Sequence, residues 1–223
     1  ATVVELHTST EVGSLVVPVL EATVGRHGYL RHAVVQEMGP RVWQLAHQAF
    51  RVDQSGTVET FAVALGGDYA RTRVDCRLAG RGAEGRLAAA YYGEDDQMLD
   101  FRTFQDHAAP DTTSELTFKG AVDGSSRSVY SGLIRVRPEA VRTSAHQTNR
   151  NVKLSSNAWA KSVPNLEIET DDVVCSHAST VSPVDEDQRF FLESRGIPTG
   201  VAERLLLEGF FENVAAAAPH PAV

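Results

Sequence analysis

The sequence predicts an all-β core with C-terminal helices: a right-handed parallel β-helix, or solenoid, followed by a small helical domain. Short runs of alternating apolar and polar residues recur along most of the chain, with turn residues between them. The stretch from Asp53 to Val174 shows no capped helical period, which disfavours the usual folds of alternating strands and helices. After Thr180 the pattern becomes helical. We therefore expect a β-helix core over residues 1–181 and a helical domain over residues 182–223.

The predicted strands begin every 12 to 17 residues along the central part of the chain. They are Thr57–Ala64, Arg71–Leu78, Arg86–Tyr92, Met98–Phe104, Glu115–Val122 and Ser128–Val136. Upstream, Gly39-Pro40 breaks any helix between Tyr29 and Phe50, which predicts strand, turn and strand. Such strands fit a sandwich, a barrel or a solenoid, and no fixed repeat length is visible. The solenoid is favoured because the inward positions are small and interchangeable, as stacked turns require. These positions are Ala62, Ala64, Val74, Cys76, Leu87 and Ala89.

Composition and charge argue against several classes of function. The chain has 223 residues, 42% of them hydrophobic, and a formal net charge of −8. This charge argues against nucleic acid and against an anionic membrane surface as partners. No apolar run approaches the roughly 18 residues of a membrane span, and no signal peptide is evident. The two cysteines, Cys76 and Cys175, do not make a disulfide framework. We therefore expect a cytoplasmic protein.

Two helices are predicted after the β-helix core. Ser182 is expected to cap the first, with Pro183 in its first turn and Gly196 at its end. Pro198 separates the helices, and Thr199 is expected to cap the second. Four apolar side chains of the second helix fall on one face, and this face must pack on the β-helix or on another protein. They are Ala202, Leu205, Leu206 and Phe210. Beyond Val214 the tail is rich in alanine and proline, and it is expected to fray.

Cys175 and His177 are the residues best able to carry chemistry. On a strand they point to the same side, with Cα atoms about 6.5–7 Å apart. A thiolate and an imidazole so placed are good ligands for zinc or for iron–sulfur centres. Zinc needs about four ligands, so distant residues or another subunit would have to complete the set. Two alternatives stay open: a buried structural cysteine beside an incidental histidine, and a cysteine nucleophile with His177 as its base.

Other candidate ligands are expected to be structural or solvated. His107 and His146 lie in polar, turn-like segments and are expected to face water rather than bind a metal. Asp171 and Asp172 are expected to end a turn and to face solvent. Cys76 alternates with apolar neighbours and is expected in the core.

Three motifs follow one another in order near the end of the chain: Ser162–Thr180, which contains Cys175-Ser-His-Ala, then Asp185–Ile197, then Ala202–Phe211. Three shorter segments precede them; they are Phe118–Ala121, Ser131–Val136 and Gln147–Asn151. Together these motifs resemble the SufB/SufD family, and the upstream segments resemble its β-helix repeats. The resemblance is clear from about Glu115 to Phe211. The Cys-Ser-His-Ala form resembles the SufD-type subunit more than the SufB type.

The resemblance implies a right-handed parallel β-helix with C-terminal helices, and a place in the SufB–SufC–SufD complex. That complex assembles iron–sulfur clusters with ATP hydrolysed by SufC. His177 would be the cluster-proximal ligand at the SufB–SufD interface, with Cys175 beside it as a weaker candidate. No tightly bound cofactor is expected, only a transient iron–sulfur cluster or iron.

The resemblance also implies partners. A SufB-like subunit would form a heterodimer through the β-helix, and a homodimer is an alternative in isolation. A SufC-like ATPase would dock on the helices, where the candidate contacts are Asp185, Phe190, Phe191, Arg195, Gly196, Glu203, Leu206, Phe210 and Phe211. The chain starts with Ala1 and lacks the helical region that usually precedes the family's β-helix, so we expect a fragment or a processed protein.

Three other functions compete with an assembly scaffold. We expect a scaffold with no turnover of its own and therefore no enzyme. The chain has no phosphate-binding Gly-rich loop with Lys-Ser/Thr, so it should not hydrolyse ATP itself, and it has no Gly-x-Ser-x-Gly elbow. The first alternative is a nucleophilic enzyme that uses Cys175 and His177. The second is a β-helix interaction protein without cluster chemistry. The third, a polysaccharide-acting β-helix, is disfavoured because the chain has no evident signal peptide and only two tryptophans, Trp43 and Trp159.

Overall fold

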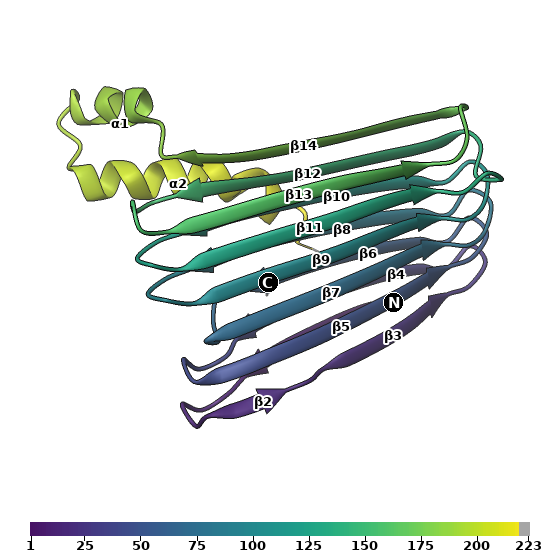
Figure 1. Cartoon of the computed structure of the whole chain (residues 1–223), viewed down its shortest axis with the longest axis horizontal. Coiled ribbons are helices and arrows are strands. Elements are labelled where there is room, and N and C mark those ends of the chain that lie inside the picture. The colour runs from purple at the N-terminus through teal and green to yellow at the C-terminus, as the bar shows by residue number, and fades with distance from the viewer. Residues whose placement is uncertain (219–223) are drawn as a thin grey trace.

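The computed structural model describes residues 1–218, and these residues form a parallel β-solenoid followed by two helices (Figure 1). The chain winds between two seven-stranded sheets. The first sheet has the order β1 (Thr2–Thr8), β4 (Tyr29–Glu37), β6 (Thr57–Ala64), β8 (Glu84–Gly93), β10 (Thr113–Val122), β12 (Thr143–Lys153) and β14 (Val173–Pro183). The second has the order β13 (Trp159–Ile168), β11 (Arg127–Val136), β9 (Met98–His107), β7 (Tyr69–Leu78), β5 (Val42–Val52) and β2 (Ser14–Val16), with β3 (Val19–Val24) also paired to β5.

All six strands predicted for the central region are present, and most extend one to three residues beyond the predicted limits. The strand, turn and strand predicted between Tyr29 and Phe50 are also confirmed, as β4 and β5. No helix interrupts the described chain before α1. The predicted parallel solenoid with C-terminal helices is therefore confirmed.

The length of one turn of the solenoid varies, which is why the sequence shows no fixed repeat. Trp43 pairs with Tyr69, 26 residues further on. Arg127, by contrast, pairs with Trp159, 32 residues further on. The additional residues lie in the connections between strands, so the strands keep their register while the sequence period drifts.

Small residues and a row of aromatic rings fill the interior between the two sheets. The six small residues predicted to face inward are all buried. Four rings from β8 to β11 follow one another along the stack, since Tyr91, Phe101, Phe118 and Tyr130 have neighbouring centroids 4.6 to 5.6 Å apart. Aromatic pairs at these separations add packing energy beyond their buried area. Beyond the rings the interior becomes more polar, and Asn149 and Asn151 of β12 are fully buried.

With Ser182 as its cap, the first helix would begin at Pro183. Helix α1 (Glu186–Glu193) begins three residues later. The prediction that Ser182 caps it is wrong, because β14 continues in register with β12 and pairs Ser182 with Val152. Asp185 is the cap, and its Oδ1 accepts hydrogen bonds from the backbone N–H groups of Asp187 and Gln188, each at 3.0 Å. The predicted division at residue 181 stays a prediction, and residues 219–223 of the predicted helical domain lie outside the described residues.

Helix α2 (Thr199–Ala215) packs across the outer face of the first sheet. Thr199 is its first helical residue, so the prediction that Thr199 caps the helix is wrong; the cap position is Pro198, which makes no side-chain cap bond. Val214 is buried against Ala33 and Phe61 of that sheet, and Ala202 is also buried. Of the predicted apolar face, Leu205 remains 42% exposed. Helix α1 buries no residue and lies beside α2 at the β14 end of the solenoid (Figure 1).

Candidate functional site

Strand β14 is the last strand of its sheet and carries both candidate ligands. It pairs in parallel with β12 along its whole length, and the other edge has no strand partner within residues 1–218. In Figure 1 it lies at one end of the stack, next to α1 and far from β2 and β3. An unpaired strand edge presents backbone N–H and C=O groups that another chain can pair with.

Cys175 and His177 lie on the face of β14 that continues the solenoid interior. Cys175 is in register with buried Ala145, and His177 is in register with buried Gln147. Cys175 is half-buried and packs against the small apolar cluster that contains Ile134. His177 is exposed, because no further turn of the described chain covers it. The structure thus confirms that the two side chains share one face, with the imidazole the more accessible of the two.

The environment of Cys175 differs from that of an activated nucleophile. Burial raises the pKa of the Cys175 thiol, and a hydrogen bond from the Ala145 backbone opposes this shift only in part. Reactive cysteines instead have a lowered pKa, usually beside a cation or a base. No hydrogen bond joins Cys175 to His177 among the described contacts. A thiol held protonated can still become a ligand when a metal displaces its proton.

Two donor atoms do not complete a metal site. In the part of the chain that the structure describes, no group of three or more His, Cys, Asp or Glu residues is arranged to hold a metal ion. Cys175 and His177 therefore offer one soft sulfur and one imidazole nitrogen at an open edge, a donor set that suits iron or an iron–sulfur cluster.

Of the two histidines predicted to face water, one is buried and the other is exposed. The prediction that His107 faces water is wrong, because its side chain is fully buried in the solenoid. Its Nδ1 and Nε2 lie 2.8 Å from the hydroxyls of Thr112 and Ser114, and burial lowers the pKa of His107 to about 4. His146 is exposed as predicted, with its Nδ1 2.7 Å from the Ser176 hydroxyl on the neighbouring strand.

The remaining polar candidates lie where they were predicted. Asp171 and Asp172 are exposed in the turn before β14. Cys76 is 1% exposed, and burial raises the pKa of its thiol to about 12. Neither the aspartates nor Cys76 belongs to the site on β14.

The predicted docking residues on the helices divide into structural and exposed groups. Asp185 caps α1, and Gly196 has a φ of +81° that ends the helical region before Pro198. Glu203 pairs with Arg189 at 3.3 Å, which ties α2 to α1. Phe210 and Phe211 are half-buried with ring centroids 5.0 Å apart, and Phe211 packs on the first sheet.

The exposed group lies on α1 and the facing side of α2. Phe190 is 70% exposed and Phe191 is 54% exposed. The Arg195 guanidinium lies over the ring of Phe191, 3.5 Å from its centroid. Phe191 and Leu206 line an open, mainly apolar hollow of about 400 Å³. Large exposed aromatic side chains of this kind are typical of interaction surfaces.

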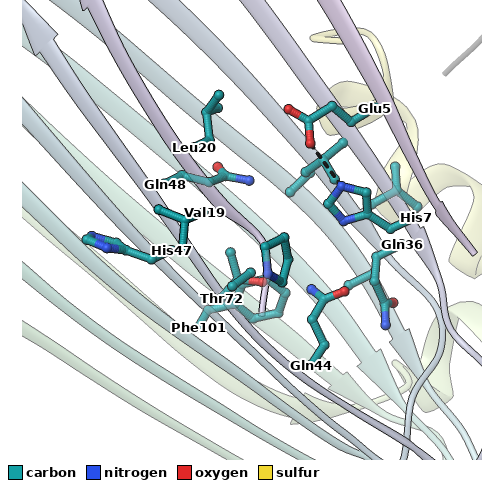
Figure 2. A pocket seen from close by; sticks show the side chains of 16 residues that line it. Glu5, His7, Val19, Leu20, Gln36, Gln44, His47, Gln48, Thr72 and Phe101 are labelled. Carbon is teal, nitrogen blue, oxygen red and sulfur yellow. Dashed lines mark hydrogen bonds and ion pairs between the residues drawn. The ribbon is translucent and has the colours of Figure 1, made fainter. Parts of the chain in front are cut away.

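A polar cluster at the opposite end of the solenoid was missed by the sequence analysis. Figure 2 shows a small cavity near β1 and β5 with Glu5 and His7 at its rim. Glu5 lies 2.9 Å from Nε2 of His7 and 3.2 Å from Nε2 of buried His32. The alternation Glu5-x-His7 was the available signal, since it places both side chains on one face. The cavity volume of about 40 Å³ suits a water molecule rather than a substrate.

The fold and the site together define a class of protein: a parallel β-solenoid that presents a thiol and an imidazole on its last strand, with two helices beyond it. Residues 1–210 match the family model described as "SUF system FeS cluster assembly, SufBD core domain". The chain therefore belongs to the SufBD family of iron–sulfur cluster assembly proteins, and the family predicted from the motifs is confirmed.

Curated relatives agree with this assignment. The chain is 39% identical over 186 residues to an iron–sulfur cluster assembly SufBD family protein of Mycobacterium tuberculosis, covering 80% of this chain and 47% of the relative. It is 29% identical over 187 residues to the iron–sulfur cluster assembly protein SufD of Escherichia coli, covering 84% of this chain and 44% of the relative. The chain thus spans about half the length of the curated relatives it matches. Across the described residues, no helix is both long and apolar enough to cross a membrane.

Proposed function

We propose that this chain is the core of a SufD-like scaffold subunit, which helps to form a nascent iron–sulfur cluster at its contact with a SufB-like subunit. Iron and sulfide are cargo in this proposal, and the chain itself catalyses no turnover. The observation that carries the proposal is the position of Cys175 and His177 on the terminal strand, with His177 open to solvent.

An incomplete donor set suits a scaffold that must release its cluster. A closed site with four ligands from one chain would hold iron tightly. Here Cys175 and His177 supply two donors, and a second subunit paired along the free edge of β14 would supply the others. A SufB-like subunit is the proposed partner, and in isolation a second copy of this chain could pair with the same edge. A rigid solenoid holds both donors without mobile loops.

The C-terminal helices are the proposed docking site for a SufC-like ATPase. Phe190 and Phe191 are more than half exposed, beside the apolar hollow that Phe191 and Leu206 line. Exposed aromatic anchors next to a hollow are the features that dominate binding energy at protein interfaces. Because α1 buries nothing of its own, a partner could cover it without disturbing the solenoid.

Reconstitution tests the assembly. The chain is mixed with a SufB-like subunit and a SufC-like ATPase, and light scattering on size exclusion measures the complex. Deletion of residues 185–211 should remove the ATPase and leave the SufB-like partner bound. A complex that keeps the ATPase without these residues would place the docking site elsewhere, and no complex with either partner would contradict the proposal.

The ligand role is tested separately. His177→Ala should abolish cluster formation in the reconstituted complex while leaving its mass unchanged. His146→Ala is the matched control, because His146 is also exposed but lies on the outer face of β12. An unchanged cluster yield in His177→Ala would remove His177 as a ligand.

A further inference from the structure

Gln147 is a buried side chain whose hydrogen-bonding capacity is unused. It lies on β12 and is 1% exposed. Both Nε2 and Oε1 of its amide lack a hydrogen-bond partner among residues 1–218. Burying an amide without partners is unfavourable, so such a residue needs an explanation beyond packing.

The next two inward residues of β12 also carry side-chain amides, and these amides do form hydrogen bonds. Asn149 donates from Nδ2 to the hydroxyl of Tyr91 at 3.1 Å. Asn151 donates from Nδ2 to Oδ1 of Asn149 at 2.8 Å, and its Oδ1 lies 2.7 Å from the Tyr91 hydroxyl. Gln147 lies on the same face of β12, two residues before Asn149 and beside His177 of β14, and it takes no part in this network.

The facing sheet leaves room for the Gln147 amide. A Cβ atom at Gly132 of β11 would be closest to the Tyr130 hydroxyl, and it would also lie only 2.5 Å from Nε2 of Gln147 and 2.8 Å from its Cδ. Any larger residue at position 132 would therefore collide with both the Tyr130 hydroxyl and the Gln147 amide. Gly132 thus makes room for two polar groups, of which the Tyr130 hydroxyl is bonded to Thr103 and the Gln147 amide is not bonded to any described residue.

The position above Gln147 is occupied by His177. The two residues are register partners on the parallel strands β12 and β14, so their side chains leave adjacent strands on the same face. Adjacent strands lie about 4.8 Å apart, so the two side chains leave neighbouring backbone positions and a change of rotamer can bring the Gln147 amide toward the imidazole. A histidine that binds a metal through one ring nitrogen almost always donates the N–H of the other to an oxygen.

We propose that Gln147 is the positioning residue for His177. Its Oε1 accepts the ring N–H of His177, which fixes the tautomer and directs the lone pair of the other ring nitrogen toward iron. This inference rests on the proposed role of His177 as an iron ligand and adds the residue that orients it.

The test replaces Gln147 by Met, which keeps the length of the side chain and removes the acceptor. Gln44→Met is the matched control, because Gln44 is 2% exposed and its Oε1 also lacks a partner among the described residues, but it lies at the other end of the solenoid. Binding of Co²⁺, as a spectroscopic probe for Fe²⁺, is measured by its ligand-field absorption on the complex of this chain with a SufB-like subunit. Nitrogen NMR of the His177 ring reports which nitrogen carries the proton.

We expect Gln147→Met to weaken Co²⁺ binding about 10-fold or more and to leave His177 as a mixture of tautomers. Gln44→Met should change neither measurement. Gln147→Glu keeps an acceptor at the same place, so the His177 ring should retain a single tautomer. This variant tests the inference if Gln147→Met folds poorly. If His177→Ala abolishes binding while Gln147→Met binds as the native chain does, the inference is wrong and the proposed function stands. If His177→Ala binds normally, the proposed function itself fails.

Discussion

Lys119 of β10 donates a hydrogen bond from Nζ to the backbone carbonyl of Phe210 in α2. The same ammonium lies 4.8 Å from the centroid of the Phe210 ring. Lys119 is only 6% exposed, although it lies on the outer face of the sheet, because α2 covers it. Burial and the nearby charge of Arg150 lower the pKa of Lys119. A partly desolvated ammonium thus joins the solenoid to α2, the helix that carries part of the proposed docking surface for a SufC-like ATPase.

Lys119→Met should loosen α2 without unfolding the solenoid. The substitution keeps most of the apolar stem but removes the charged donor, and such a hydrogen bond contributes about 1.5–3 kcal/mol. We expect amide hydrogen exchange in α2 to become roughly tenfold faster or more, while exchange in β8 and β10 stays unchanged. Lys161→Met is the control, since Lys161 is exposed on the other sheet. Unchanged exchange in α2 would show that apolar packing of Val214 and Phe211 is enough to hold the helix.

His107 should make the stability of the solenoid depend on pH. Its pKa in the folded chain is about 4, whereas an unfolded histidine has a pKa of about 6.5. Because the unfolded chain binds the proton more readily, stability is fully present above pH 6.5 and is lost as the pH falls toward 4. We expect a loss of about 2 kcal/mol between pH 7.5 and pH 5 that is due to His107.

Urea unfolding of the native chain and of His107→Gln at both pH values measures this contribution. His107→Gln lowers stability at pH 7.5 but should lose about 2 kcal/mol less on acidification. His146→Gln is the matched control for the loss of an exposed imidazole. Parallel pH profiles for the native chain and His107→Gln would contradict the assignment.

His107 also shows what the sequence could not reveal. Its segment looks polar and turn-like, but the polar neighbours Thr112 and Ser114 face inward and provide its partners. Strand positions, by contrast, follow from local alternation, which is why the six central strands and the burial of Cys76 were predictable. Register was not predictable, because the turns of the solenoid differ in length. The pairing of His177 with Gln147, 30 residues away, therefore required the structure.

Two glycine substitutions should change stability in opposite directions. Gly120 is buried on β10, and a Cβ atom there would overlap the ring of Tyr91. Gly120→Ala should therefore cost about 1–3 kcal/mol, since the ring belongs to the aromatic row and has little room to move. Gly209 lies within α2 with nothing within 4 Å of its Cβ position, so Gly209→Ala should stabilise that helix by about 0.5–1 kcal/mol. Thermal unfolding of both variants gives the comparison, and a stabilising Gly120→Ala would show that the interior is looser than described.

Asp185→Ala tests which residue begins α1. Oδ1 of Asp185 accepts two backbone hydrogen bonds, and loss of such a cap costs about 1 kcal/mol of helix stability. Because α1 buries no residue, this loss should be confined to the helix, seen as faster hydrogen exchange over residues 186–193 with an unchanged melting temperature of the solenoid. Ser182→Ala should leave the exchange of α1 unchanged, since Ser182 belongs to β14 and pairs with Val152. If Ser182→Ala loosened α1 and Asp185→Ala did not, the helix would begin at the residue that the sequence first indicated.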